Sequence, residues 1–254
     1  LMINLEQSLP KEMLRTNKSG AYHCTTIVDC NTRKQHGLLV IPIPELDNDN
    51  HVLLSSLDET VIQHGAPFNL GLHKYQGDCY SPNGHKYIRE FNCESVPQTI
   101  YRVGGEILTK EKVFISHENR ILIKYTLVDA HSETTLQFRP FLAFRNANSL
   151  CIENNQIDKS YDVPGYFELP IKKGESIIFS AGVGEIKPRS LTTMYNKEIG
   201  MRTCRTSFFN CLKNSAQQFY LKRGKDNYLL AGYPWFKVRA RDSFIALPGC
   251  TLAI

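Results

Sequence analysis

Two segments of the chain place polar and aromatic side chains close enough together to do chemistry. Residues 231–236 read AGYPWF and hold the only tryptophan, and residues 240–243 read ARDS. A flat ring can cover the apolar face of a pyranose, while an arginine and an aspartate form strong, directional hydrogen bonds with its hydroxyl groups. These residue types indicate a sugar site made by Trp235, Arg241 and Asp242. The spacing is equally compatible with Asp242 capping a helix and Arg241 neutralising it.

The second segment, residues 31–39, reads NTRKQHGLL. It gathers the amide of Asn31, the guanidinium of Arg33 and the imidazole of His36 in front of an apolar strand that Gly37 opens. Such a group suits a polar turn that enters a strand. It also suits a domain interface or a support for a nearby site. Spacing alone leaves both interpretations open.

Several chemistries require motifs that the sequence lacks. It has no G-x-x-x-x-G-K-[ST] phosphate loop, no G-x-G-x-x-G turn before a helix, no H-E-x-x-H and no G-x-S-x-G. None of its eight cysteines forms a C-x-x-C pair. We therefore expect no cofactor and no bound metal. His117 and Glu118 fall in a predicted turn and are expected to form a polar hairpin tip.

The net charge and the cysteines limit which classes of partner and which cellular compartment the sequence predicts. The net charge is +5 and the pI about 8.7, but the densest basic cluster, Arg239 with Arg241, is too small for a nucleic-acid surface. No apolar run approaches the ~20 residues of a membrane span. We expect no nucleic-acid and no membrane partner. The cysteines are expected to be free and mostly buried, which indicates a reducing, cytoplasmic location.

Short strands with alternating side chains dominate the first 188 residues. Strands are predicted at 25–28, 38–43, 113–115, 121–127, 136–144, 167–171 and 177–179, after a polar stretch over residues 1–20. In one of them Ile121, Ile123, Tyr125 and Leu127 share a face, and alternation is expected to continue in the next from Leu136 to Phe144. Residues 64–85 read as a long loop. Strands at hairpin spacing without intervening helices favour a mainly β fold, an antiparallel β-sandwich.

The pattern changes after Pro188. Phe208, Cys211, Leu212, Ser215 and Phe219 fit a helical stripe, and Ser190 and Thr203 are candidate helix caps. A further helix is expected to start near Ser243 and to stop near Pro248. The resulting domain prediction is a β-sandwich over residues 1–188, a helical linker over 189–224 and the start of another domain over 225–254. The chain ends in apolar sequence, which predicts that the natural protein continues past Ile254.

Several motifs, in order along nearly the whole chain, resemble those of the bacterial and archaeal glycogen debranching enzymes, the amylo-α-1,6-glucosidase family. The stretches that carry the resemblance are 20–22, 31–40, 57–60, 139–145, 231–236 and Arg241 with Asp242. Members of that family have a β-sandwich like the N-terminal supersandwich domain of glucoamylases, followed by an (α/α)6 barrel. The resemblance thus implies that the chain ends just inside the first part of this barrel.

The resemblance implies a function as well. The parent enzyme would remove α-1,6-linked glucose stubs from glycogen or branched maltodextrin by inverting hydrolysis, with one carboxyl as general acid and one as general base. Arg241 and Asp242 would hold hydroxyls of the terminal glucose, and Trp235 would help wall the pocket. The acid and base would lie beyond Ile254, so no catalytic residue is expected in this chain. Its partner would be its own C-terminal (α/α)6 catalytic domain, without which the fragment is expected to be inactive.

The chain departs from the family pattern at three places. Lys237-Val238-Arg239-Ala240 stands where relatives have a small residue, an acid, Trp and Gly, which puts the pocket shape in doubt. Gln35 stands where Tyr is frequent, and the stretch from Glu153 to Val163 is shorter than in relatives. Two other functions are weighed against the debranching enzyme. One is a stand-alone glucan-binding or structural module, and the other is part of a sugar phosphorylase of related architecture.

Overall fold

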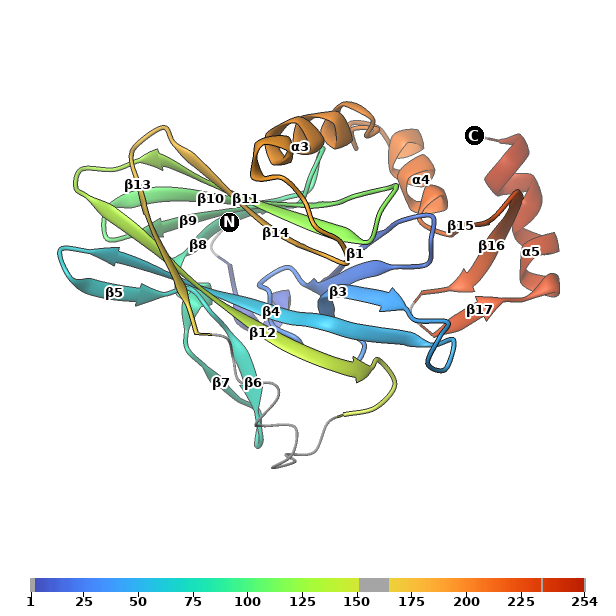
Figure 1. Cartoon of the computed structure of the whole chain (residues 1–254), viewed down its shortest axis with the longest axis horizontal. Coiled ribbons are helices and arrows are strands. Elements are labelled where there is room, and N and C mark those ends of the chain that lie inside the picture. Colours follow the sequence, from blue (N-terminus) through green and yellow to red (C-terminus); the bar gives the residue numbers. More distant parts are fainter. Residues whose placement is uncertain (1–2, 151–164, 234, 254) are drawn as a thin grey trace.

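The computed structural model describes residues 3–150, 165–233 and 235–253, and it is mainly β (Figure 1). Two antiparallel sheets face each other as a sandwich, and a small third sheet with short helices follows them. This confirms the antiparallel sandwich that the strand spacing predicts. The stretch from Glu153 to Val163, which is shorter than in the family that the chain resembles, lies outside the described residues.

The larger sheet has the strand order β1-β2-β3-β4-β12-β13, and β5 also pairs with β4. Its strands are β1 (Glu12–Thr16), β2 (Tyr22–Thr26), β3 (Gly37–Pro42), β4 (Asn50–Gln63), β5 (Ala66–Asn69), β12 (Thr134–Asn146) and β13 (Phe167–Ile171). The long pair β4–β12 forms its centre, with Leu136 opposite Val61 and Pro140 opposite Leu57. Strand pairing therefore starts with β1, within the polar stretch over residues 1–20 for which the sequence predicted no strand.

The smaller sheet has the order β14-β11-β10-β9-β8. Its strands are β8 (Ile88–Asn92), β9 (Gln98–Val103), β10 (Glu106–Phe114), β11 (Arg120–Asp129) and β14 (Ser176–Gly182). The predicted turn at His117–Glu118 joins β10 to β11, whose residues Phe114 and Ile121 pair directly. A separate hairpin of β6 (His73–Tyr75) and β7 (Cys79–Ser81), with the 3-10 turn η1 (Gly84–Tyr87), occupies the region that we expected to be one long loop.

The core lies between the two sheets. Ile121, Ile123, Tyr125 and Leu127 are all buried in it, as the alternation predicts, and the Tyr125 ring lies 4.9 Å from the ring of Phe138 across the sandwich. Each large apolar side chain buried in this way contributes roughly 1.5–3 kcal/mol. These contacts fix the two sheets relative to each other.

The alternation predicted for residues 136–144 holds only to Pro140. Leu142 and Phe144 are 40% and 47% exposed. The β4–β12 register shifts between Phe141 and Leu142 and again before Arg145, and Phe144 has a φ of 46°. The apolar pattern therefore leaves the core at the end of β12 where its regular pairing with β4 breaks down.

Four α-helices are present in the described residues: α1 (Leu5–Ser8), α3 (Leu191–Gly200), α4 (Phe208–Gln217) and α5 (Ala240–Leu247). The 3-10 turn η2 (Pro188–Ser190) precedes α3 and the π turn η3 (Pro248–Leu252) follows α5. Helix α3 covers the outer face of the smaller sheet, where Tyr195 packs with Val113, Ile115 and Leu122. None of the described helices has the length and apolar character to cross a membrane.

The helix ends differ from the predicted ones. Ser190 precedes α3 but its side chain makes no capping hydrogen bond, and the cap of α4 is Ser207 rather than Thr203, with Asn210 N–H donating to its Oγ at 3.2 Å. Helix α5 begins at Ala240, before the expected Ser243, and ends at Leu247 as expected. The predicted stripe on α4 is not buried, since Phe208 is 80% and Leu212 49% exposed.

Seven cysteines are described, and all seven are free. Only Cys24 and Cys30 are buried, whereas Cys79 and Cys204 are exposed. The expectation of mostly buried thiols was therefore wrong. The expectation was based on the apolar residues next to most of these cysteines in the sequence. Such neighbours do not bury a thiol that lies in a loop or on the outer face of a hairpin.

Candidate functional site

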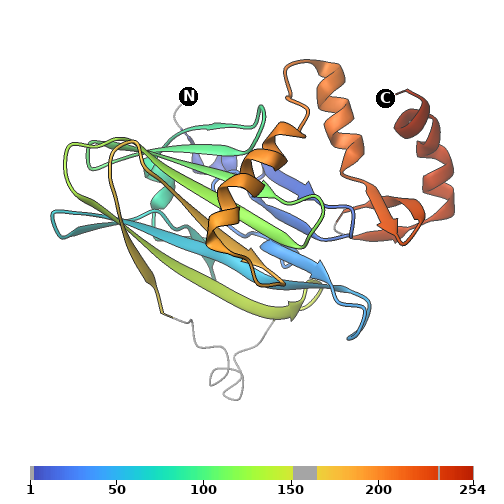
Figure 2. The same ribbon diagram turned by 45° about the horizontal axis from the view of Figure 1, so that its top comes forward.

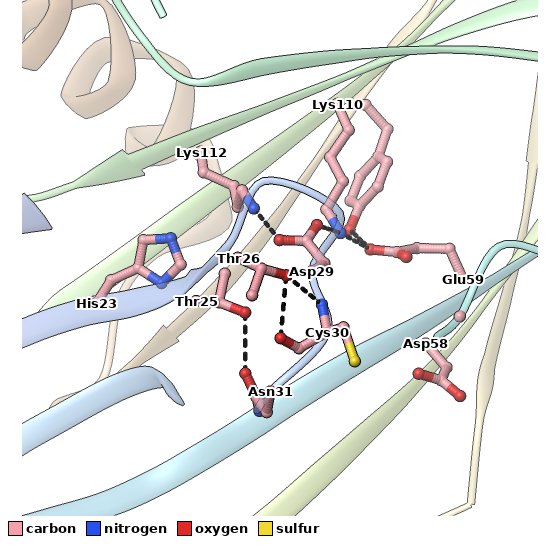
Figure 3. A network of polar contacts seen from close by, with 12 residues as sticks. His23, Thr25, Thr26, Asp29, Cys30, Asn31, Asp58, Glu59, Lys110 and Lys112 are labelled. Carbon is pink, nitrogen blue, oxygen red and sulfur yellow. Dashed lines mark hydrogen bonds and ion pairs between the residues drawn. The ribbon is translucent and has the colours of Figure 1, made fainter. Parts of the chain in front are cut away.

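The segment that holds Asn31, Arg33 and His36 connects β2 to β3, and a buried charge network anchors its start (Figure 3). Asp29 has a φ of 57° and accepts from the ammonium groups of Lys110, at 2.8 Å, and Lys112. Lys110 also contacts Glu59 Oε1 at 2.5 Å, and the hydroxyl of Tyr125 donates to the same oxygen. The two lysines come from β10 in the opposite sheet, so the network ties the loop across the sandwich.

The electrostatics of this network are those of buried, mutually compensated charges. Burial favours the neutral form of Asp29, but the charges of Lys110 and Lys112 outweigh it and hold the pKa of Asp29 well below its ordinary value. Burial raises the pKa of Glu59 in spite of Lys110. A buried charge without a partner is strongly destabilising, so each of these groups depends on the others.

The side chain of Asn31 links two strands of the larger sheet through hydrogen bonds. Its side-chain oxygen accepts from Thr25 Oγ at 2.9 Å, and its amide donates to the carbonyl of Ser55 at 2.9 Å (Figure 3). The amide therefore links β2 to β4 and holds the start of the segment. This agrees with a supporting position rather than with direct binding of a ligand.

His36 and Arg33 both approach Glu12 on β1. Arg33 Nε lies 2.6 Å and His36 Nε2 lies 3.4 Å from Glu12 Oε1. His36 is buried, and its Nδ1 accepts from the backbone N–H of Thr32 at 3.1 Å. Burial lowers the pKa of His36, and Glu12 only partly opposes this. The imidazole is therefore neutral at pH 7, with its proton on Nε2 facing Glu12.

Glu12, Cys24 and His36 bring three potential metal ligands within 4.8 Å of one another. Burial and the nearby carboxylate of Glu12 raise the pKa of the Cys24 thiol to about 12, and Arg33 already pairs with Glu12. In this structure Cys24 is a thiol and Glu12 is paired with Arg33, so the three groups form a polar junction beside β1.

The structure brings residues 31–39 and residues 231–236, the two segments that the sequence singled out, into contact. The guanidinium of Arg33 lies over the ring of Trp235, 5.5 Å from its centroid. Beside them Tyr233 packs against Tyr22 of β2, with ring centroids 5.8 Å apart. The small sheet of β15 (Tyr220–Arg223), β16 (Asp226–Gly232) and β17 (Phe236–Val238) is thereby held against the outer face of the larger sheet (Figure 1).

A shallow cleft of about 100 Å³ adjoins Trp235. Trp235 is 51% exposed, and the polar part of the lining includes Asn48 and Asp49 before β4, Asn50 at its start, and the cationic Arg223 and Lys237. An exposed indole beside amide and carboxylate groups is the arrangement that a sugar ring needs. The residues at 48–50 were not predicted as part of a site, since their composition indicates only a turn.

Two of the four residues that depart from the family pattern, Lys237 and Val238, line the same cleft. Lys237 forms an ion pair with Asp49 at 2.9 Å, and the guanidinium of Arg239 lies 4.4 Å from the centroid of the Phe236 ring. Bonding to Lys237 lowers the pKa of Asp49. Lys237 therefore holds this carboxylate in its ionised form at the edge of the cleft.

Arg241 and Asp242 lie in the first turn of α5, with Arg241 Nη2 3.3 Å from Asp242 Oδ1. The N-cap is Arg239, so Asp242 does not cap the helix, although a carboxylate in the first turn favours the helix dipole. Arg241 is largely exposed, and Asp242 Oδ2 is buried without a hydrogen-bond partner among the described residues. The pair stays together, but neither residue belongs to the described lining of the Trp235 cleft.

Comparisons with known proteins give two matches in sequence order. The family model described as "Glycogen debranching enzyme N terminal" matches residues 11–197, and the model described as "Amylo-alpha-1,6-glucosidase" matches residues 214–254. No curated protein and no solved structure matches the chain. The first matched region contains Arg33 and the second contains Trp235, so the contact between these residues joins the two regions.

Proposed function

The chain belongs to the family of glycogen debranching enzyme N-terminal regions, as its motifs predict, and from this premise we propose that it is the non-catalytic N-terminal part of an enzyme that hydrolyses α-1,6-glucosidic branch stubs. The observation that carries the proposal is the pair of family matches, to the N-terminal region over residues 11–197 and to the amylo-alpha-1,6-glucosidase family over residues 214–254. The substrate would be glycogen or a branched maltodextrin.

The proposed chemistry needs a protonated carboxyl group as acid and an ionised one as base. The carboxylate next to the Trp235 cleft, Asp49, is ion-paired with Lys237 and has a lowered pKa, so it is unsuited to donate a proton. We therefore propose that the acid and the base belong to a part of the enzyme beyond Ile254. This chain would supply the surface that receives the glucan.

We propose Trp235, Arg241 and Asp242 as glucan-binding residues. Trp235 would stack on a sugar ring, and the exposed Arg241 with Asp242 would bond its hydroxyls in a part of the site that the cleft does not include. Asn31, Arg33 and His36 would support the site, since they fix the loop on which Trp235 rests.

The domain organisation stays a proposal: a sandwich over 1–188, a helical linker over 189–224 and the beginning of an (α/α)6 barrel over 225–254. Helices α4 and α5 present apolar side chains to solvent, with Phe208 80%, Phe244 76% and Ile245 74% exposed. Such a surface is the usual mark of a contact. We propose that the enzyme's own C-terminal catalytic domain covers it.

The function is tested by comparing this 254-residue chain with the same chain extended through the catalytic domain. Both are incubated with a phosphorylase limit dextrin, and released glucose is measured. We expect release from the extended chain alone. Glucose release by the 254-residue chain would contradict the assignment of the acid and base to the region beyond Ile254, and no release by either would contradict the debranching activity.

A second candidate function, a glucan-binding module, is favoured by the exposed indole beside the amide groups of the cleft. Titration of a linear maltooligosaccharide into the chain distinguishes binding from a purely structural role. Finally, we propose a cytoplasmic location, which the seven free cysteines support, because thiols persist in reducing compartments.

A further inference from the structure

An ion pair connects the two walls of the Trp235 cleft. One wall belongs to the small sheet, where β17 carries Lys237, and the other to the turn before β4, which carries Asp49. Figure 2 shows the small sheet, in orange and red, at one end of the sandwich. Lys237 Nζ lies 2.9 Å from Asp49 Oδ1 and 3.4 Å from the carbonyl oxygen of Asn48. The ammonium group of Lys237 therefore bridges the cleft.

The bridged cleft is too small to enclose a sugar. Its volume is about 100 Å³, whereas sites for small molecules begin at roughly 300 Å³. A pyranose that stacks on the indole of Trp235 therefore needs room that a side chain of the cleft now fills. The side chain of Lys237 is 69% exposed and ends a flexible four-carbon stem, so it can turn out to solvent without disturbing the core.

Asp49 is placed to bind a sugar hydroxyl group. Its side chain is 34% exposed, so its carboxylate is accessible to a ligand. Bonding to Lys237 and to Asn146 lowers the pKa of Asp49, and the ionised carboxylate is a strong acceptor for hydroxyl donors. Oδ1 accepts from Lys237, whereas Oδ2 accepts from Asn146 Nδ2 at 3.4 Å. Departure of Lys237 thus frees Oδ1, while Asn146 still holds the carboxylate.

We propose that Asp49 is a further glucan-binding residue and that Lys237 lowers the affinity of the cleft, because its ammonium group competes with a sugar hydroxyl group for Asp49 Oδ1. The proposal rests on the glucan-binding role proposed for Trp235. An exposed ion pair changes an equilibrium constant by at most about fivefold, whereas a hydrogen bond to a charged group changes it by about tenfold or more. The exchange therefore favours the sugar, and Lys237 weakens binding without preventing it.

The first test is calorimetric titration of maltoheptaose into the 254-residue chain. Lys237→Met removes the ammonium group but keeps the length of the side chain, and it should tighten binding about two- to fivefold. Asp49→Ala breaks the same ion pair but also removes the acceptor. Because the second effect is larger, this variant should weaken binding at least about twofold. The two partners of one ion pair should thus have opposite effects, which a purely structural pair would not give.

Ionic strength supplies a second readout. From about 0.01 M to about 1 M salt the Debye length falls from about 30 Å to about 3 Å, which weakens an exposed ion pair. Maltoheptaose is neutral, so its binding to the parent should tighten by up to about fivefold at high salt, while its binding to Lys237→Met should stay constant. The matched control is Lys74→Met, which breaks the exposed pair with Asp78 on the β6–β7 hairpin and should behave as the parent does.

Unchanged or weaker binding by Lys237→Met would overturn the proposal, as would unchanged or tighter binding by Asp49→Ala. Circular dichroism shows whether the variants are folded, and if Asp49→Ala is not, Lys237→Met and the salt series decide the question. If the parent binds and Trp235→Ala weakens binding, such a failure leaves the role of Trp235 intact. Absence of binding by every variant would overturn both roles. Glucose release by the extended chain tests the debranching function independently.

Discussion

The guanidinium of Arg33 lies 5.5 Å from the centroid of the Trp235 ring, and its Nε lies 2.6 Å from Glu12 Oε1. One side chain thus joins the first strand of the sandwich to the loop that carries the exposed indole. The ring of Trp235 lies against the guanidinium of Arg33, and the ion pair with Glu12 sets the position of that guanidinium. This relationship leads to the first prediction.

A double-mutant cycle of Arg33→Ala and Trp235→Ala should give a coupling free energy of about 0.5–1 kcal/mol, the size of an exposed cation–π contact. The cycle cancels the loss of the Arg33–Glu12 ion pair, which occurs in both variants that lack Arg33. Free energies of unfolding come from urea titrations. Strictly additive effects of the two substitutions would show that the contact contributes nothing in solution.

Trp235→Ala should weaken binding of maltoheptaose at least about tenfold, because stacking of the ring on a pyranose is lost. Trp235→Phe should keep part of the affinity. The matched control is Tyr166→Ala, which removes an aromatic side chain of similar exposure (54%) on the sandwich. Isothermal calorimetry measures both, and an equal effect of the two alanine variants would contradict a specific role for Trp235.

Asp29→Asn should destabilise the chain by about 3–5 kcal/mol, since it removes the shared partner of two buried ammonium groups and leaves Lys112 uncompensated. Guanidinium chloride unfolding measures the change. Asp78→Asn is the control. It breaks the exposed pair of Asp78 with Lys74 and should leave the unfolding midpoint unchanged. A small effect of Asp29→Asn would contradict the prediction that the buried ammonium groups of Lys110 and Lys112 depend on Asp29 for their stability.

Stability should fall as the pH falls from about 6.5 to about 3, because burial, with Lys112 nearby, lowers the pKa of His23 to about 3. Below the ordinary histidine pKa of about 6.5 the unfolded chain takes up a proton that the folded chain refuses. One such group contributes a slope of up to about 1.4 kcal/mol per pH unit. Asp29, with its lowered pKa, adds a further loss below about pH 4, the ordinary range of an aspartate.

The variant His23→Asn isolates the histidine contribution. Asn can still donate to the carbonyl of Gly37, which lies 3.2 Å from His23 Nδ1, but it does not titrate. Its free energy of unfolding should depend less on pH between 3 and 6.5 than that of the parent. His131→Asn, at an exposed position, should leave the slope unchanged. Parallel pH profiles for the parent and His23→Asn would exclude the buried imidazole as the cause.

Local pattern predicted the sandwich well because alternation reports directly on which face of a strand is buried. Ile121, Ile123, Tyr125 and Leu127 lie in the core as expected, and the helices α3 and α4 follow Pro188, although the strands β15 to β17 come after them. The pattern failed at Leu142 and Phe144, which are exposed where the pairing of β12 with β4 becomes irregular. That pairing joins strands far apart in sequence, so the sequence of β12 alone does not indicate where it ends.

The candidate site was predictable only in part. The types of Trp235 and Arg33 indicated chemistry, but their contact depends on the packing of the small sheet against β2, through Tyr233 and Tyr22. Asn48 and Asp49 belong to no motif, and only the fold brings them beside Trp235.

The pairing of β4 with β12 has a consequence for the order of events during synthesis. The centre of the larger sheet joins Asn50–Gln63 to Thr134–Asn146, so β4 leaves the ribosome long before its neighbour exists. Until then its edge is open to wrong pairing, while the hairpins β8 to β11 can already form locally. A pause in translation before residue 134 would therefore expose the nascent chain to aggregation more than one after residue 146.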